Sequence, residues 1–188
     1  MNAAQEDCPW GALSDLPGHP MMWVLILTEL VTFGLLLIMF AITRAIHPTL
    51  FAAGQARLDQ TAGGINTIVL ITSGWMAALA LEARSEGRHG IARLQLGGAA
   101  SLGAVFTAIK LAEYIAKAQA GIGIESDTFF TLYLLLTGFH LLHVVLGIVI
   151  LAAAAFADTV ENLKTATAFW HMVDLVWVVM YPLVYLIG

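Results

Sequence analysis

The stretch that most constrains the fold of this chain is an apolar run from residue 129 to residue 156. It contains no Asp, Glu, Lys or Arg, but it holds two imidazoles, His140 and His143. A run this long and this apolar predicts a helix that spans a membrane. The two histidines are three residues apart and share one face of that helix, which we expect to point at protein because a polar ring is costly in hydrocarbon.

The composition agrees with a membrane protein. Of the 188 residues, 60% are hydrophobic and 11% are charged, more apolar surface than a soluble domain of this length can bury. The net charge of -5 is modest and no basic block is present, so we expect no nucleic-acid partner. The single cysteine, Cys8, excludes an internal disulfide, and no Cys/His cluster indicates zinc.

Five segments have the length and apolarity of spans. The predicted helices cover residues 23–43, 65–82, 94–116, 128–157 and 167–187, after a polar tail over residues 1–22. They predict an all-α integral membrane protein, in which one domain over residues 23–188 is a bundle of five transmembrane helices. The connections are predicted to be polar or glycine-containing loops, at residues 44–64, 82–93, 117–127 and 158–166.

The distribution of basic residues predicts the orientation. Five spans place the tail and the loops at 82–93 and 158–166 on one side, with four Lys or Arg residues, against three on the other side. Because cytoplasmic loops carry the excess of basic residues, this favours a cytoplasmic N-terminus and a periplasmic C-terminus.

Alanine recurs at every fourth position of the third predicted span. The residues are Ala100, Ala104, Ala108, Ala112 and Ala116. Small residues at this spacing let helix backbones approach closely in lipid, so we expect a packing seam here. The alternative is that alanine is simply common in this chain. Lys110 and Glu113, one turn apart in the same span, are expected to pair with each other or to extend to the interface.

Three ionisable residues enter the membrane at similar depth. Glu29 lies in the first span, and His171 and Asp174 are one turn apart in the fifth. We predict that they share one polar cluster, since an isolated charge at this depth is expensive, and the alternative is that each group satisfies local backbone separately. For Glu29 itself we favour a hydrogen-bonding strut between helices, and the alternative is a site that exchanges protons or is coupled to a lipid headgroup.

His140 and His143 also invite a metal hypothesis, which we do not favour. Two imidazoles at this spacing cannot ligate one haem from both faces, and a non-haem metal needs more ligands than they supply. We therefore expect them to form hydrogen bonds between helices, and we expect no metal site and no catalytic centre in this chain.

Several motifs resemble those of subunit III of the haem–copper oxidase superfamily. Residues 137–147, TGFHLLHVVLG, resemble its G-F-H-x-x-H-V-x-x-G signature, and residues 169–177, FWHMVDLVW, resemble its W-H-F-V-D-x-V-W signature. Residues 27–33, LTELVTF, are similar to the stretch that holds the family's buried glutamate, with Thr28 where serine is usual. By this resemblance the signature residues are Glu29, Asn66, Glu113, Tyr114, Gly138, His140, His143, Gly147, Trp170, His171, Asp174 and Trp177.

The resemblance implies a function as well as a fold. The resemblance covers residues 23–188. The chain is similar to the five-helix forms found in bacterial quinol oxidases and in small proteins associated with nitric oxide reductase. The resemblance implies a non-catalytic accessory subunit in the bacterial inner membrane, which stabilises a catalytic subunit with many spans and supports proton uptake. Haem with copper, or haem with non-haem iron, belongs to that partner, and phospholipid is implied as a further ligand.

Two hypotheses of other classes remain open at this stage. A small proton-coupled transporter would use Glu29, Asp174 and the histidines as a relay, and broken helices with repeat symmetry would mark it. A membrane metalloenzyme would need a fuller set of histidine and carboxylate ligands. Within the favoured hypothesis, the accessory protein of a nitric oxide reductase is the alternative to the oxidase subunit.

Overall fold

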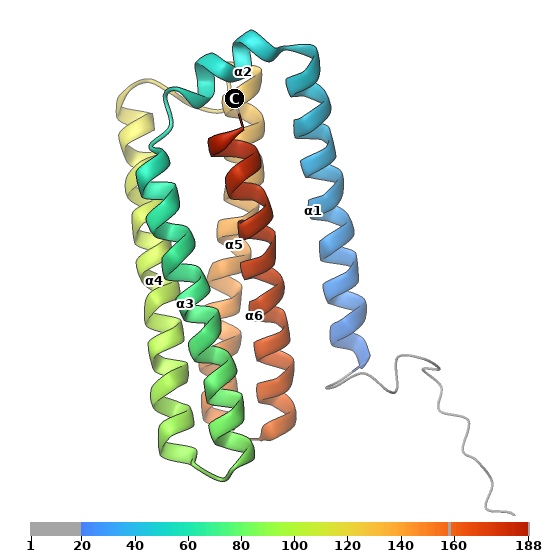
Figure 1. Ribbon diagram of the computed structural model, residues 1–188, viewed down its shortest axis with the longest axis vertical. Helices are drawn as coiled ribbons and strands as arrows, with labels where there is room; N and C mark the ends of the chain where they lie inside the picture. The colour runs from blue at the N-terminus through green and yellow to red at the C-terminus, as the bar shows by residue number, and fades with distance from the viewer. Residues whose placement is uncertain (1–19, 158, 188) are drawn as a thin grey trace, which may run out of the picture.

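The computed structural model describes residues 20–157 and 159–187, and in this part of the chain five helices are long and apolar enough to cross a membrane (Figure 1). They are α1 (Pro20–Ile46), α3 (Gln60–Ser85), α4 (His89–Gln119), α5 (Thr128–Ala157) and α6 (Val160–Tyr181), which continues into the π-helical segment η2 (Pro182–Leu186). The predicted number of spans and the all-helical class are confirmed. The predicted tail over residues 1–22 lies outside the described residues, except at its end.

The helices extend beyond the predicted spans because their polar ends are capped. The five spans are 26 to 31 residues long, or roughly 40–46 Å at 1.5 Å per residue, against about 30 Å of hydrocarbon. The Asp59 carboxylate accepts from the backbone N–H of Ala62 at 3.0 Å and starts α3, and Thr159 accepts from the N–H of Asn162 at 3.3 Å and starts α6. The predicted loop at 158–166 is therefore wrong from residue 160 onward.

The predicted loop at 44–64 is also wrong, because it contains a helix. Pro48 begins α2 (Pro48–Gln55). The first backbone N–H of a helix has no partner within the helix, so a proline at this position loses no hydrogen bond. This short helix lies across the end of the bundle between α1 and α3 (Figure 1). It is held there by Phe51, whose ring centroid lies 5.1 Å from that of Phe40 and 5.3 Å from that of Phe129.

The C-terminal end of the bundle changes from α to π geometry at Pro182. Proline has no N–H to continue the α-helical pattern, and the N–H of Ile187 donates to the Pro182 carbonyl at 2.9 Å, five residues back. The side-chain amide of Gln55 donates to the carbonyls of Val184 and Ile187 at 2.9 and 2.8 Å. The amide of Gln60 donates to the Tyr185 carbonyl at 3.0 Å. Glutamines from α2 and α3 thus cap the last helix.

The helices differ in how far they are buried. In the most apolar window of α6, 56% of the residues are buried, against 17% in α1. The last helix is therefore the centre of the bundle, and α1 lies at its edge (Figure 1).

The expected alanine seam on α4 does not form inside the described bundle. Ala104, Ala108, Ala112 and Ala116 are exposed, and the buried residues of α4 instead include Ala99, Gly103, Phe106 and Lys110. The reason is geometric: an α-helix has 3.6 residues per turn, so a strict spacing of four drifts by about 40° per step. The buried residues of α4 are instead spaced alternately by four and three residues, which keeps them on one side of the helix.

We predict that Gln55→Leu lowers the free energy of unfolding by about 1–3 kcal/mol, because two C-terminal carbonyls lose their donor. Thermal unfolding in detergent micelles, followed by circular dichroism, measures this. Gln119→Leu at the exposed end of α4 is the matched control, with an expected change within about 0.5 kcal/mol. Equal losses in the two variants would contradict the capping role of Gln55.

Candidate functional site

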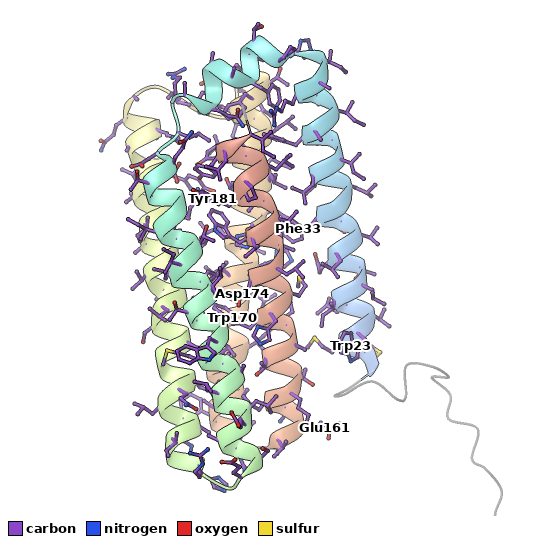
Figure 2. All side chains as sticks on the ribbon, in the orientation of Figure 1. Trp23, Phe33, Glu161, Trp170, Asp174 and Tyr181 are labelled. Atoms are coloured by element: carbon purple, nitrogen blue, oxygen red, sulfur yellow. The ribbon has the colours of Figure 1, made fainter. Side chains whose placement is uncertain are left out.

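The centre of the bundle is the indole ring of Trp170, which is fully buried. A side chain at Gly103 of α4 would lie 2.7 Å from one of its ring carbons, and a side chain at Gly147 of α5 would lie 2.6 Å from another. The indole N–H donates to the Ser73 hydroxyl of α3 at 3.1 Å, and Ser73 donates to the Ala99 carbonyl at 2.7 Å. One side chain of α6 therefore fixes the distances to α3, α4 and α5 (Figure 2).

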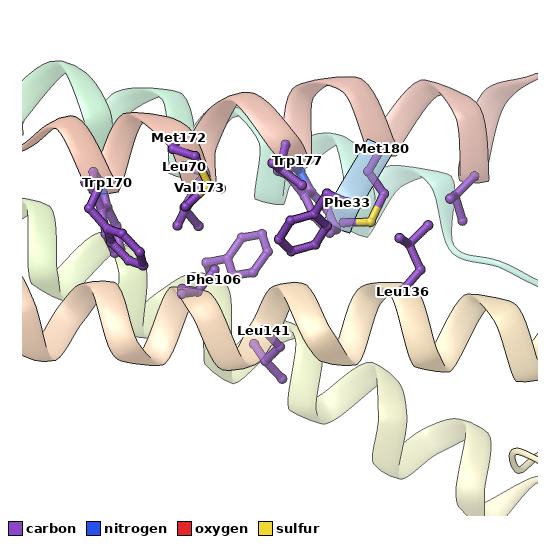
Figure 3. Packing of buried hydrophobic residues seen from close by; sticks show 14 of the residues in the cluster. Phe33, Leu70, Phe106, Leu136, Leu141, Trp170, Met172, Val173, Trp177 and Met180 are labelled. Carbon is purple, nitrogen blue, oxygen red and sulfur yellow. The ribbon is translucent and has the colours of Figure 1, made fainter. Parts of the chain in front are cut away.

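An aromatic layer follows two turns further along α6. The Trp177 indole donates to the Thr67 hydroxyl at 3.0 Å, and its ring lies 4.8 Å from Phe106 and 5.2 Å from His140. Figure 3 shows Phe33, Phe106 and Trp177 gathered between the helices. His140 is fully buried, with Nε2 lying 3.1 Å from the Val173 carbonyl. Because a carbonyl only accepts, Nε2 carries the proton, and His140 links α5 to α6.

Glu29 pairs with the other signature histidine. Its Oε2 lies 3.1 Å from Nε2 of His143, and Nδ1 of His143 donates to the Phe139 carbonyl at 2.8 Å. The Glu29 side chain is 22% exposed and the His143 side chain 6%. Since Nδ1 must hold a proton to donate, one further proton, on either Nε2 or the carboxylate, makes the pair neutral. This pair joins α1 to α5.

His171 and Asp174 form a separate pair on α6. Nδ1 of His171 lies 3.7 Å from Oδ2 of Asp174, and the carboxylate occupies the space that a side chain at Gly74 of α3 would need. The expected cluster of these two residues with Glu29 is therefore divided into two pairs. The three residues lie at similar depths in the sequence of their helices, but α1 is rotated so that Glu29 faces His143 of α5.

The largest polar network of the bundle lies around a buried lysine, Lys110, whose side chain is 1% exposed. Its amine donates to Glu113 at 2.9 Å, to the Tyr133 hydroxyl at 3.0 Å and to the Tyr185 hydroxyl at 2.8 Å. Tyr133 donates to Glu113 at 2.6 Å, and the Lys117 amine lies 3.5 Å from the same carboxylate. We call these five residues the lysine–tyrosine cluster.

The lysine–tyrosine cluster brings together more cations than anions. It holds two amines and one carboxylate, so with all three ionised it carries one positive charge in excess. Uncompensated charge is costly in a membrane. The faces of four aromatic rings, Tyr114, Tyr133, Trp177 and Tyr185, lie 5.0 to 5.6 Å from the Lys110 amine and offset part of this cost.

The sequence predicted only part of this cluster. The pairing of Lys110 with Glu113 was expected from their spacing of three residues, and the structure shows it. Tyr133 and Tyr185 were missed, since they come from α5 and η2 and contact Lys110 across 23 and 75 residues of sequence. No local pattern reports contacts of that kind.

The remaining signature residues occupy different environments. The Tyr114 hydroxyl donates to Thr137 at 2.7 Å, linking α4 to α5. Asn66 of α3 is 1% exposed, and its amide has no hydrogen-bond partner among the described residues. Gly147 makes room for Trp170, whereas a side chain at Gly138 would meet no atom within 4 Å. Close packing inside this chain thus explains Gly147 but not Gly138.

Among the residues that the structure describes, no hydrogen bond joins the lysine–tyrosine cluster to His140 or His143. The Trp177 ring is the contact that they share, since it lies 5.6 Å from the Lys110 amine and 5.2 Å from the His140 ring. Within residues 20–157 and 159–187, no three His, Cys, Asp or Glu side chains gather in a way that could hold a metal ion.

Comparison with known proteins identifies the family of this chain. The profile of the family described as Cytochrome c oxidase subunit III matches residues 52–188. Cytochrome c oxidase subunit 3 of Synechocystis sp. is 27% identical over 157 residues, and Cytochrome bo(3) ubiquinol oxidase subunit 3 of Pseudomonas aeruginosa is 27% identical over 187 residues. A Heme-copper oxidase subunit I+III of Aeropyrum pernix is 28% identical over 181 residues.

These matches cover most of this chain but different shares of the relatives. They include 79% of the chain for the Synechocystis protein and 88% for each of the other two. The chain spans 66% of the Synechocystis protein, 22% of the Aeropyrum protein and 83% of the Pseudomonas protein. It therefore spans less than two thirds of two of these three relatives.

We predict that Gly147→Ala destabilises the bundle by about 1–3 kcal/mol, because the new methyl group overlaps the Trp170 ring. Gly138→Ala on the same helix is the matched control. With open space around it, we expect a change within about 0.5 kcal/mol. The free energies of unfolding of the two variants are measured in detergent micelles. Equal destabilisation would contradict the close fit between Gly147 and Trp170.

We predict that Glu113→Gln is more destabilising than Lys110→Met. Removal of the carboxylate leaves two buried amines without a counter-charge, at a cost of about 3–5 kcal/mol. Lys110→Met instead leaves Glu113 with Lys117. Unfolding midpoints of the two variants in nanodiscs test the order, and a larger loss for Lys110→Met would contradict this account of the lysine–tyrosine cluster.

Proposed function

Because this chain belongs to the cytochrome c oxidase subunit III family, we propose that it is a non-catalytic accessory subunit of a bacterial haem–copper respiratory oxidase. The observation that carries the proposal is the family match, which extends over residues 52–188 and includes both histidine-containing signatures. The bundle described above suits such a role, since its buried carboxylates face amines or imidazoles of the same chain.

The partner in this proposal is a catalytic subunit with many spans. The name of the Aeropyrum relative joins subunit I and subunit III in one protein, which supports a pairing of this chain with a subunit I. The exposed faces of α1 and α4 are apolar along most of their length, as contact with lipid or with such a partner requires. We assign haem and copper to the partner and no cofactor of that kind to this chain.

We place the complex in the bacterial inner membrane, with the N-terminus in the cytoplasm. The match with a protein of the bacterium Pseudomonas aeruginosa, 83% of which is covered, supports the bacterial setting, and the five apolar helices support the membrane. The orientation rests on the four basic residues predicted on one side against three on the other.

An affinity pull-down from native membranes in mild detergent tests the proposal. Mass spectrometry and an optical spectrum identify what accompanies the chain, and we expect an oxidase with copper and with low-spin and high-spin haem. None of the three relatives named above is a nitric oxide reductase component. Recovery of a reductase with haem and non-haem iron would overturn the oxidase assignment. Recovery of a colourless, solitary protein would favour a transporter.

We further propose that the Glu29–His143 pair supports proton uptake by the oxidase rather than holding the complex together. Glu29→Gln keeps a polar side chain beside His143 but removes the exchangeable acid. We expect this variant to co-purify with the catalytic subunit in wild-type amount, measured by quantitative mass spectrometry. Glu161→Gln, an exposed acid at the start of α6, is the control. Loss of the partner only in Glu29→Gln would make Glu29 a structural strut.

A further inference from the structure

A groove of about 580 Å³ lies where the start of α3 meets the end of α4, at the end of the bundle that carries α2 (Figure 1). Arg57 and Asp59 line it from the connection between α2 and α3, and Glu113 and Lys117 line it from α4. Its other lining residues are aliphatic, namely Ala62, Ile109, Ala112, Ala116, Ala120 and Ile122. The groove thus combines four charged side chains with an aliphatic wall.

The charged residues in and behind this groove include one cation in excess. Inside the lysine–tyrosine cluster, the amines of Lys110 and Lys117 face the single carboxylate of Glu113. The groove adds one guanidinium, that of Arg57, and one carboxylate, that of Asp59. The Asp59 carboxylate already accepts a backbone N–H at the start of α3. Three cations therefore stand against two anions, and the groove attracts a further negative charge.

Two of these cations lack a close anionic partner in the described part of the chain. The Lys117 side chain is 9% exposed, and its amine makes two polar contacts there, at 3.5 Å to Glu113 and at 3.5 Å to the Arg57 carbonyl. Both contacts are longer than the roughly 2.7–3.2 Å of a good hydrogen bond. The exposed Arg57 guanidinium lies 5.2 Å from the Phe130 ring and pairs with no described carboxylate. A buried ammonium that is held so loosely gains from an additional anion.

The aliphatic wall of the groove continues along α4 as a row of small residues. Ala104, Ala108, Ala112 and Ala116 are exposed, so no described helix covers them, and the last two line the groove. The row extends about 18 Å along the helix axis at 1.5 Å per residue. Residues spaced by four form a ridge inclined to that axis, and a helix packed on such a ridge crosses at about 40–50°. The alanines thus offer a second helix close approach from outside the bundle.

We propose that this groove and the alanine row bind a transmembrane helix of another subunit, which places a carboxylate beside Arg57 and Lys117. The proposal rests on the proposed function, because it requires a complex. The Arg57 guanidinium donates to the carboxylate at the mouth of the groove, and the added negative charge balances the excess of the lysine–tyrosine cluster behind it. The backbone of the incoming helix lies on the alanines, where close packing holds it.

The charge and shape of this face favour such a helix over other occupants. A second copy related by a two-fold axis would bring the same cations of the two chains together, which repels. An acyl chain fills apolar space but brings no negative charge, and a small anion leaves the alanine row uncovered. A helix with an acidic side chain supplies both the charge and the packing. Its carboxylate is in turn affordable in the membrane only where it faces cations.

The packing is tested by co-expressing the tagged chain with the other subunits and purifying the complex in mild detergent. Mass spectrometry then quantifies each subunit per copy of this chain. We expect Ala112→Phe to lower the recovery of the contacting subunit by roughly tenfold, because the ring fills the groove and separates the helices. Ala152→Phe, at an exposed alanine of α5, is the matched control and is expected to leave the recovery unchanged. Circular dichroism verifies that both variants are folded.

The charge is tested separately at Arg57. We expect Arg57→Glu to lower the recovery by roughly tenfold, since it sets a carboxylate against a carboxylate, and Arg57→Lys to retain most of it. Lys164→Glu, at an exposed cation of α6, is the matched control. Recovery that stays unchanged in both Ala112→Phe and Arg57→Glu would overturn the proposal and leave the proposed function intact. An equal loss in the two controls would also overturn it, and a wild-type chain that recovers no other subunit would overturn both proposals.

A cross-link identifies the carboxylate. The amine introduced by Arg57→Lys can be joined by a carbodiimide to a carboxylate that it contacts, and mass spectrometry of the peptides locates the bond. We expect an Asp or Glu in a transmembrane helix of another subunit. A bond formed only with Asp59 or Glu113 of this chain, or with a second copy of it, would overturn the proposal.

Discussion

The arrangement of this bundle depends on the fit of one indole ring, that of Trp170, between two glycines. Without side chains at Gly103 and Gly147, α4 and α5 can both approach α6 at the level of the ring. The hydrogen bond from the indole to Ser73 sets the position of α3 at the same level. Helices in lipid gain little from burying apolar surface, so close packing and buried hydrogen bonds determine how they associate. This single contact supplies both.

The ionisable residues inside the bundle are arranged so that nearly every one faces a partner. Glu29 faces His143, Asp174 faces His171, and Glu113 lies between Lys110 and Lys117. Breaking such a pair leaves a charge that hydrocarbon cannot solvate, which is why these residues tie helices together even if they also exchange protons.

Much of the fold could be predicted from the sequence, because the length of an apolar run is set by the thickness of the membrane. The start of α6 could not, since the segment that extends beyond the hydrocarbon is polar and resembles a loop. The helix α2 was missed because Pro48, which breaks a helix from within, begins one here. Of the site, the contact of Lys110 with Glu113 is local and was predictable. The pairing of Glu29 with His143 depends on how α1 is rotated, which hydropathy does not report.

We propose that this chain is an accessory subunit whose own residues hold no redox centre. The most direct measurement is to purify the complex, dissociate this chain from its partner, and determine haem, copper and iron in each fraction by pyridine haemochrome spectra and metal analysis. We expect all haem and copper to remain with the partner and the separated chain to be colourless. Haem or a stoichiometric metal in the separated chain would contradict the account.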